Sequence, residues 1–354
     1  MMRLSIAALK QLATRLRADV GVDLGTANSL VYVRGQGIVV REPSVIARTQ
    51  DGHILAVGEE AKRMIGRTPA HITATRPMKG GVIADFGVTS AMLAYFFRKA
   101  LRNRYARRPR VVVGIPTGAS QVERRAVIDA SLHAGAGEAY IIEEPLAAAL
   151  GVGSPVSEPV ATTIVDIGGG RTDVAVIALG GIVTSGSIRV AGDEMDEAII
   201  QYARRAYNLV IGERTAEAIK IEVGSATPFG GEEPMVEVRG RQILSGLPRI
   251  VRMTAAEVRE AIAEPVKAII ETVRRTLEHS PPELSSDMIT RGIVMVGGGA
   301  LLRGIDTLVG EETGMPVHVS SDPLSAVILG AGRVLYDMGG FPHVLRSSAS
   351  LTGA

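Results

Sequence analysis

The chain has 354 residues, enough for about two domains of ~150 residues each. Its hydrophobic content of 46% excludes a disordered chain, and 39 Lys+Arg against 37 Asp+Glu leave a net charge of +2, too balanced for a protein that coats nucleic acid. The absence of cysteine excludes disulfide scaffolds, thiolate zinc sites and cysteine nucleophiles. No window approaches the ~18 uninterrupted apolar residues of a membrane-spanning helix, so we expect a soluble protein of a reducing compartment.

Residues 1–17 are predicted to form a basic amphipathic helix that lies on a membrane surface. On a helical wheel, most of their apolar side chains fall within an arc of about 140°, and the basic side chains fall outside it. The residues expected to contact lipid are Met2, Ile6, Leu9, Leu12 and Leu16 on the apolar side and Arg3 and Lys10 on the basic side. Two other interpretations are a secretory signal, which Lys10 and Arg15 disfavour by interrupting the apolar stretch, and a helix packed on the protein's own surface.

Strand-like apolar runs alternate with helical stretches along the rest of the chain, which indicates an α/β fold. One pattern, an apolar strand that runs through Asp into a Gly turn and then a hairpin, occurs at residues 20–33 and again at residues 161–177. A third apolar strand, residues 293–296, also ends in glycines. The repetition predicts two similarly built lobes, with a hinge in the Gly-, Pro- and Ser-rich stretch 151–159.

The first two Gly turns are candidate phosphate-binding sites. Tight Gly turns let backbone N–H groups converge on phosphate oxygens, and short polar side chains such as those of Thr26 and Asn28 add donors. Two such turns facing one another would clamp a polyphosphate, while Asp23 and Asp166 would hold Mg²⁺ through water. Each turn alone is equally well explained as an ordinary hairpin turn, but the repetition favours the phosphate site.

Together these features resemble the actin, Hsp70 and sugar-kinase superfamily of nucleotide-clamping proteins. Longer stretches are similar to the MreB family of bacterial actin-like filament proteins, from about residue 19 to about residue 338. The stretches that carry this resemblance are Asp23–Leu30, Arg76-Pro77-Met78-Lys79, Gly81–Phe86, Ile142-Glu143-Glu144-Pro145, Ile188–Gln201, Gly212-Glu213-Arg214-Thr215-Ala216-Glu217 and Pro281-Pro282-Glu283-Leu284.

The resemblance implies an actin-like α/β fold, with two similar lobes, each a mixed β-sheet flanked by helices, and four subdomains around a nucleotide cleft. The first lobe would span 18–155, with a small subdomain at roughly 40–78. The second would span 156–338, with a small subdomain at roughly 192–255. Residues 339–354 are expected to be a flexible tail.

The resemblance also implies roles for individual residues. Contacts to the nucleotide would come from the Gly turns and an adenosine-side helix, through Asp23, Gly25, Thr26, Ala27, Asn28, Asp166, Gly168, Gly169, Gly170, Glu213, Glu217, Lys220, Gly297, Gly298 and Gly299. The catalytic residues would be Glu144, Thr172 and Asp173, of which Glu144 orients the attacking water. From the residues alone, a helix-capping role would be favoured for Glu144, and a solvated ladder of charges for the helix that carries Lys220.

Two residues depart from the family pattern, Arg171 and Asp173, the second of which shortens a carboxylate by one methylene. Where MreB commonly reads Gly-Gly-Gly-Thr-Thr-Glu, this chain reads Gly-Gly-Gly-Arg-Thr-Asp, so that Arg171 places a permanent cation beside the second turn. An inward-pointing Arg171 would bind phosphate or pair with Asp173, and an outward-pointing one would be a charge at a strand edge. The sequence leaves these alternatives open, and with them the hydrolysis rate and the preference for ATP over GTP.

A second basic cluster carries seven cations between Arg98 and Arg110. Such a run usually marks a solvated helix end and loop, and RNA binding is a further interpretation. We expect the loop to contact anionic headgroups beside the helix at 1–17, because each Lys or Arg contributes about 1 kcal/mol near anionic lipid.

By resemblance, the protein is an actin-like cytoskeletal filament protein that uses ATP and Mg²⁺, cytoplasmic and peripheral on the inner face of the cell membrane. It would hydrolyse ATP slowly, organise lateral cell-wall synthesis and maintain rod shape. Its expected partners are other copies of itself, an anionic membrane surface and membrane proteins of cell-wall elongation, but no nucleic acid. The alternatives are a small-molecule kinase of the same superfamily, for which no catalytic base stands out, and a plasmid-partitioning filament, which the basic amphipathic start disfavours.

Overall fold

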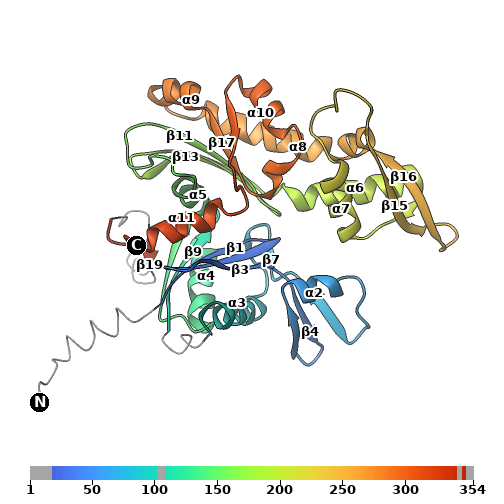
Figure 1. The fold of residues 1–354 in the computed structure, drawn as a ribbon, viewed down its shortest axis with the longest axis horizontal. Helices are drawn as coiled ribbons and strands as arrows, with labels where there is room; N and C mark the ends of the chain where they lie inside the picture. Colours follow the sequence, from blue (N-terminus) through green and yellow to red (C-terminus); the bar gives the residue numbers. More distant parts are fainter. Residues whose placement is uncertain (1–17, 103–107, 341–344, 348–354) are drawn as a thin grey trace, which may run out of the picture. The chain divides into compact units, whose positions relative to one another are not determined.

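The computed structural model describes residues 18–102, 108–340 and 345–347, and the chain divides into two compact units (Figure 1). The first unit ends at Glu143 and resumes at Val327, and the second spans Glu144–Ala326. The chain therefore leaves the first unit and later returns to it, whereas the sequence places the lobe boundary at 155/156 and extends the second lobe to 338. The helix predicted for residues 1–17 lies outside the described residues.

The first unit is built on a six-stranded sheet in the order β19-β10-β9-β1-β2-β3. In chain order its strands are β1 (Asp19–Leu24), β2 (Asn28–Val33), β3 (Gly37–Pro43), β9 (Arg110–Ile115), β10 (Glu138–Glu143) and β19 (Arg346–Ser347). β1, β2 and β3 form an antiparallel meander, whereas β9 is parallel to both β1 and β10. β19 pairs with β10, so two residues of the segment expected to be a flexible tail form a strand.

Helices cover both faces of this sheet. On one face, α3 (Phe86–Leu101) and α4 (Gln121–His133) enclose an apolar core that includes Phe96, Phe97 and Ile128. α11 (Ala326–Val334) approaches the other face so closely that a Cβ on Gly21 would lie 3.3 Å from the Ala331 Cβ. This packing makes α11 part of the first unit, although it follows the second unit in the sequence.

The second unit repeats the sheet plan of the first, in the order β13-β12-β11-β17-β18. Its strands are β11 (Thr162–Ile167), β12 (Thr172–Ala178), β13 (Gly181–Ile188), β17 (Ile293–Val296) and β18 (Val317–Val319). β11, β12 and β13 form an antiparallel meander, and β17 runs parallel to both β11 and β18. The first strand of each meander thus has the meander on one side and two parallel strands on the other, which confirms the prediction of two similarly built lobes.

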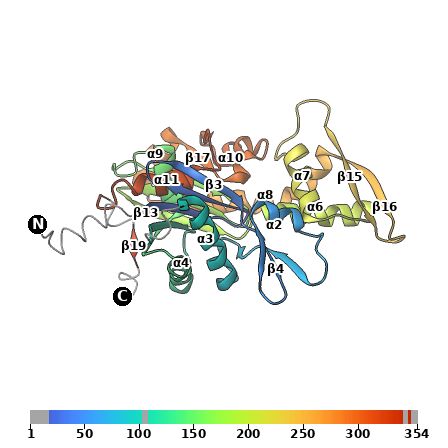
Figure 2. The same ribbon diagram turned by 60° about the horizontal axis from the view of Figure 1, so that its bottom comes forward.

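The long α8 (Ala255–Glu278) packs against one face of the second sheet (Figures 1 and 2), and α5 (Glu144–Val152) packs against the other (Figure 1). On the α8 face, Gly186 leaves the space that the helix needs, because a Cβ there would lie 2.2 Å from Thr276 Oγ1. The remaining short helices of this unit are α9 (Ser285–Arg291) and α10 (Ile305–Thr313), with 3-10 turns η2 (Pro282–Leu284) and η3 (Gly298–Leu301).

Each unit also carries a small subdomain. In the first unit it consists of β4 (Ile46–Thr49), β5 (Ile54–Val57), β6 (Ile72–Thr75) and α2 (Glu59–Met64), and the short hairpin β7 (Met78–Lys79) and β8 (Val82–Ile83) follows. In the second unit it consists of α6 (Gly192–Tyr207), β14 (Leu209–Val210), α7 (Glu213–Val223), β15 (Met235–Gln242) and β16 (Pro248–Thr254). None of the described helices is long and apolar enough to span a membrane.

The strand that leads to the third Gly turn depends on one glycine. Gly292 joins α9 to β17 at φ 72°, and a Cβ there would lie 2.2 Å from the backbone oxygen of Pro316. We therefore expect Gly292→Ala to lower the free energy of unfolding by about 2–4 kcal/mol, from left-handed strain and a clash with backbone. Urea unfolding measures this, with Gly314→Ala as the control.

Gly314 has φ 69° but open space around its Cβ, so its replacement isolates the strain and should lower the free energy by only about 1 kcal/mol. If both variants lose the same free energy of unfolding, the clash with Pro316 does not contribute to the destabilisation of Gly292→Ala.

Candidate functional site

In the first Gly turn, four residues, 25–28, lie between the last register partners of β1 and β2, Leu24 and Ser29, and the fourth of them, Asn28, is also the first residue of β2. Gly25 is required in this loop, since a Cβ would lie 2.5 Å from the Asn28 backbone oxygen. Ser44 fixes the turn from outside, donating its Oγ–H to the Gly25 oxygen at 2.6 Å. Sequence analysis did not find Ser44, because its role depends on the packing of β3 beside the turn.

The turn keeps backbone donors available. The Ser44 amide donates to the Ala27 oxygen at 3.0 Å, and the Gly81 amide donates to Thr26 Oγ1 at 3.0 Å. The amides of Thr26 and Ala27 themselves donate to no acceptor within the described residues. Because amides in a partly buried turn need a partner, this loop has the donors that an anion would bind.

The second Gly turn has the same length and the same internal contact. Ile167 and Thr172 are its last register pair, so four residues, 168–171, again form the loop. Gly168 donates its amide to the Arg171 oxygen at 2.9 Å, and a Cβ on Gly168 would lie 3.2 Å from that oxygen. Position for position, Gly25 therefore matches Gly168 and Asn28 matches Arg171.

The N-terminus of α6 supports the second turn. The amides of Gly192 and Asp193 donate to the oxygens of Gly168 and Gly169 at 3.3 and 2.7 Å. These helix amides are therefore engaged within the protein. The amides of Gly169 and Gly170 donate to no acceptor in the described part of the chain, so the second turn, like the first, retains donors for an anion.

One carboxylate precedes each turn. Asp23 and Asp166 are the fifth residues of β1 and β11, respectively. Burial raises the pKa of Asp23 to about 7, and Asp166 is only 9% exposed. Within the described ranges no three His, Asp or Glu side chains cluster as a metal site.

The predicted catalytic residues of β12 differ in their surroundings. Thr172 is buried and donates its Oγ1–H to the Val190 oxygen at 2.8 Å, which gives its hydroxyl a structural role. Asp173 is also buried and pairs in register with Asp166. The two carboxylates therefore lie side by side on the sheet face that α5 covers.

The adjacent glutamates at the start of α5 also differ. Glu143 Oε1 accepts a hydrogen bond from Arg124 Nη2 at 2.8 Å, in a pair whose Arg side chain is 11% exposed. Glu144 is the first residue of α5, which packs on β11 and β12. Glu143 therefore has a structural partner in α4, and the orientation of water by Glu144 stays a prediction.

In the third Gly turn, packing against β11 leaves no room for a side chain at two of the three glycines. Gly297 has φ 81°, and its Cβ would lie 2.4 Å from Asp166 Oδ1. A Cβ on Gly299 would lie 2.2 Å from Ile167 Cγ2. Gly298 has more room, with Leu324 Cδ2 at 3.4 Å as the nearest atom to a Cβ. Glycine is therefore needed at positions 297 and 299 because the end of β11 lies so close, whether or not a ligand also passes there.

Lys220 of α7 lies beside the second turn, at the start of α6. Its Nζ donates to the Gly192 oxygen at 2.7 Å and pairs with Asp196 at 2.8 Å, so it belongs to no solvated ladder of charges. Burial raises the pKa of Asp196 to about 6, although Lys220 acts in the opposite direction. Glu213 and Glu217, also predicted on this helix, lie on α7, with Glu213 exposed and Glu217 half-buried.

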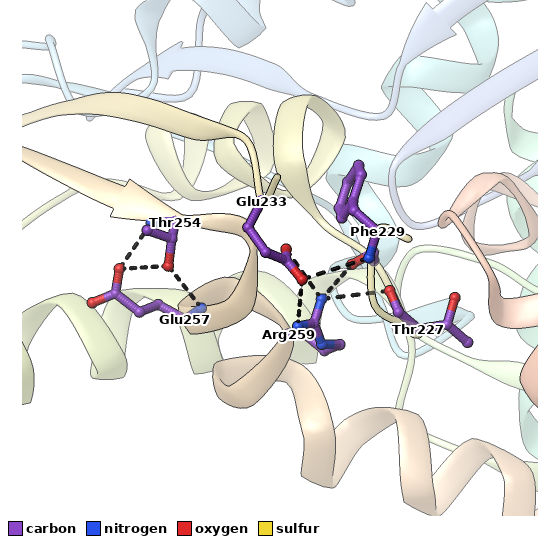
Figure 3. A network of polar contacts seen from close by, with 7 residues as sticks. Thr227, Phe229, Glu233, Thr254, Glu257 and Arg259 are labelled. Atoms are coloured by element: carbon purple, nitrogen blue, oxygen red, sulfur yellow. Dashed lines mark hydrogen bonds and ion pairs between the residues drawn. The ribbon is translucent and has the colours of Figure 1, made fainter. Parts of the chain in front are cut away.

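A half-buried arginine holds the segment after α7, as Figure 3 shows. Arg259 of α8 donates through Nη2 to Glu233 at 2.8 Å and through Nη1 to Ser225 Oγ at 3.2 Å. Arg303, which follows the third Gly turn, stacks on the ring of Phe229 in the same segment at 4.2 Å. The segment therefore ties α7 to α8 and to the third turn, a role that no sequence motif signals.

The basic cluster at 98–110 has fewer available charges than the sequence suggests. Arg110 makes two hydrogen bonds to Asp19, of 2.8 and 2.9 Å, and Lys99 pairs with Glu42. Arg98, Arg102 and Arg108 are exposed, and residues 103–107 lie outside the described part. A lipid contact of this cluster would thus rest on the exposed arginines.

Asp23 predicts a pH dependence of stability. Because burial raises the pKa of Asp23 above its unfolded value, the folded state binds more protons between about pH 4 and 7, and stability falls as the pH rises through that window. Asp23→Asn should therefore raise the free energy of unfolding at pH 8 by about 1–3 kcal/mol and change it little at pH 5. Urea unfolding of the nucleotide-free protein at both pH values measures this.

Asp19→Asn on the same strand is the matched control. It removes a carboxylate that accepts from Arg34 and Arg110, and should destabilise the protein at both pH values. A loss of stability at pH 8 in both variants would contradict the role of burial at Asp23.

Comparisons with known proteins agree with this arrangement. The family model for MreB/Mbl protein matches residues 17–341. The cell shape-determining protein MreB of Escherichia coli K12 is 53% identical over 333 residues, which cover 92% of this chain and 96% of that protein. A crystal structure of MreB5 of Spiroplasma citri bound to AMPPNP matches with a TM-score of 0.87 and 37% identity, covering 92% of this chain and 98% of that chain.

A MamK double helical filament shares the fold, with a TM-score of 0.75 and 24% identity over 91% of this chain and 99% of that chain. The actin-like fold predicted from the sequence is thereby confirmed. With a matching family model over most of its length and a relative identical at more than half of the aligned positions, the chain belongs to the MreB/Mbl family.

Proposed function

We propose that this protein is an ATP-binding, actin-like filament protein that determines cell shape. The observation that carries the proposal is the matched pair of turns, 25–28 and 168–171, each with backbone amides that have no acceptor within the described residues. Two equal loops at the same place in two equally built sheets favour one shared ligand, and amides in such turns favour phosphate.

The relatives support the nucleotide and the cellular role. The Spiroplasma protein was solved with AMPPNP, a nucleoside triphosphate analogue, and the Escherichia coli protein is named for cell-shape determination. For this chain we infer that ATP is the nucleotide and that Mg²⁺ accompanies it, held through water by Asp23 and Asp166. Bound Mg²⁺ supplies charge neutralisation at the phosphates.

The chain's own residues would divide the work at the nucleotide. The free amides of Thr26, Ala27, Gly169 and Gly170 bind phosphate oxygens. Glu144 orients the attacking water, and Glu213 and Glu217 of α7 contact the adenosine. Lys220 acts indirectly, because its ammonium group holds the start of α6 and thereby the second turn.

Polymerisation and membrane association complete the proposal. Head-to-tail contacts between copies build an open filament, and residues 1–17, together with the exposed Arg98, Arg102 and Arg108, bring it to an anionic inner membrane face. Because one short amphipathic helix binds weakly, many helices on one filament bind firmly through avidity. Membrane proteins of cell-wall elongation are the partners that we propose for such a filament.

The role of Glu144 can be tested by substitution. Glu144→Gln should lower the ATP hydrolysis rate about 100-fold or more, because an amide cannot take up a proton from water, and should leave binding of Mg-AMPPNP within about threefold. Phosphate release and equilibrium binding measure the two effects. Glu143→Gln, which weakens the pair with Arg124, is the control and should lower thermal stability more than the hydrolysis rate. Equal hydrolysis by the Glu144 variant and the wild type would exclude the role.

Assembly and anchoring can be tested together by electron microscopy with anionic liposomes. With Mg-ATP we expect filaments that coat the vesicles, and soluble filaments from a protein that lacks residues 1–17. If both proteins form filaments that stay in solution, the filament proposal stands and the membrane role of residues 1–17 is excluded. The absence of polymers in every condition would contradict the proposed function.

A further inference from the structure

The second turn carries a cation that has no partner. Arg171 is half-buried, its Nε is enclosed, and its side chain makes no hydrogen bond or ion pair with any described residue. One of the alternatives from the sequence is thereby excluded, because Arg171 does not pair with Asp173.

An enclosed guanidinium N–H without an acceptor is unfavourable. Leaving such a group unsatisfied costs more free energy than an ordinary hydrogen bond contributes, so it persists where a ligand supplies the missing acceptor. The neighbouring cations need no ligand. Lys220 is bound to Asp196 and to the Gly192 oxygen, and Arg189, near the end of β13, is exposed and has a partner of its own.

The duplication indicates what that ligand is. Arg171 is the fourth residue of its loop and matches Asn28, the fourth residue of the first loop, by sheet register and by the contact of its backbone oxygen with the first Gly. The sequence assigns Asn28 to phosphate binding. A longer, charged donor at the matching position would reach an anion held by the amides of Gly169 and Gly170, and guanidinium binds phosphate oxygens in a bidentate manner.

The surrounding charges favour the terminal phosphate, rather than the inner ones, as the group that Arg171 binds. Arg171 directly precedes β12, whose second residue is Asp173, and Asp166 is the register partner of Asp173. α5, which begins at Glu144, packs on β11 and β12. Three carboxylates would repel a highly charged terminal phosphate, and Arg171 opposes them at the place where the attacking water is proposed to be oriented.

We propose that Arg171 binds the terminal phosphate of a nucleoside triphosphate and makes this chain favour the triphosphate over the diphosphate. The inference rests on the proposed function, since it assigns one more residue to the same nucleotide site. Arg171 acts there as a specificity-determining residue, and the MreB pattern, with Thr at this position, has no such cation.

The test compares equilibrium binding of Mg-AMPPNP and Mg-ADP by calorimetry for the wild type, Arg171→Thr and Arg171→Lys. We expect Arg171→Thr to weaken AMPPNP binding roughly 10- to 100-fold, as for the loss of one charge-assisted hydrogen bond, and ADP binding less than about threefold. Arg171→Lys should restore part of the affinity, because it keeps the charge but not the bidentate geometry.

Two controls separate this role from diffuse charge and from folding. Arg189→Thr removes a cation close to the same turn and should change AMPPNP binding less than about threefold. Thermal unfolding without nucleotide should show Arg171→Thr to be at least as stable as the wild type, because it removes an unsatisfied donor. A destabilised Arg171→Thr, or equal losses for AMPPNP and ADP, would overturn the assignment to the terminal phosphate.

The failure of the inference differs from the failure of the proposed function. A wild type that binds AMPPNP, with an Arg171→Thr variant that binds it equally well, overturns the inference and leaves the function standing. A wild type that binds neither nucleotide overturns both.

Discussion

The constraint on which the site depends is the hydrogen bonding of two four-residue loops. In each loop two carbonyl oxygens accept hydrogen bonds from outside the loop, from Ser44 in the first and from the start of α6 in the second. This arrangement fixes the loop while leaving some of its amides without an acceptor. Because a buried amide without a partner is unfavourable, the same contacts that stabilise the loops also prepare them for an anion.

The sheets around the loops explain why the arrangement occurs twice. In both units the strand that ends in the loop lies between an antiparallel meander and two parallel strands, and its fifth residue is Asp. The loop therefore begins at the same point of the sheet and has the same length. What differs is the chemistry of the fourth position, which is Asn28 in the first loop and Arg171 in the second.

Much of this could be predicted from the sequence, because strands, Asp and Gly turns are local signals. The repeated hairpins, the loops and the acidic residues before them all follow from patterns of a few residues. The boundary at Glu143 and the return of α11 to the first unit could not be predicted, because they depend on Gly21 and Ala331 meeting from opposite ends of the chain. The roles of Ser44 and Arg259 likewise depend on contacts between distant segments.

The fate of single charges shows the same limit. From the residues alone, Lys220 is one of a row of charges on a helix, and Arg171 has three possible roles. In the folded chain, the Lys220 ammonium group is bound to the Gly192 oxygen and to Asp196, whereas the Arg171 side chain has no partner among the described residues and can bind a ligand. A charge is informative about function when the fold encloses it and leaves it unsatisfied, and that property arises only once strands from one hairpin are brought beside the helices that cover them.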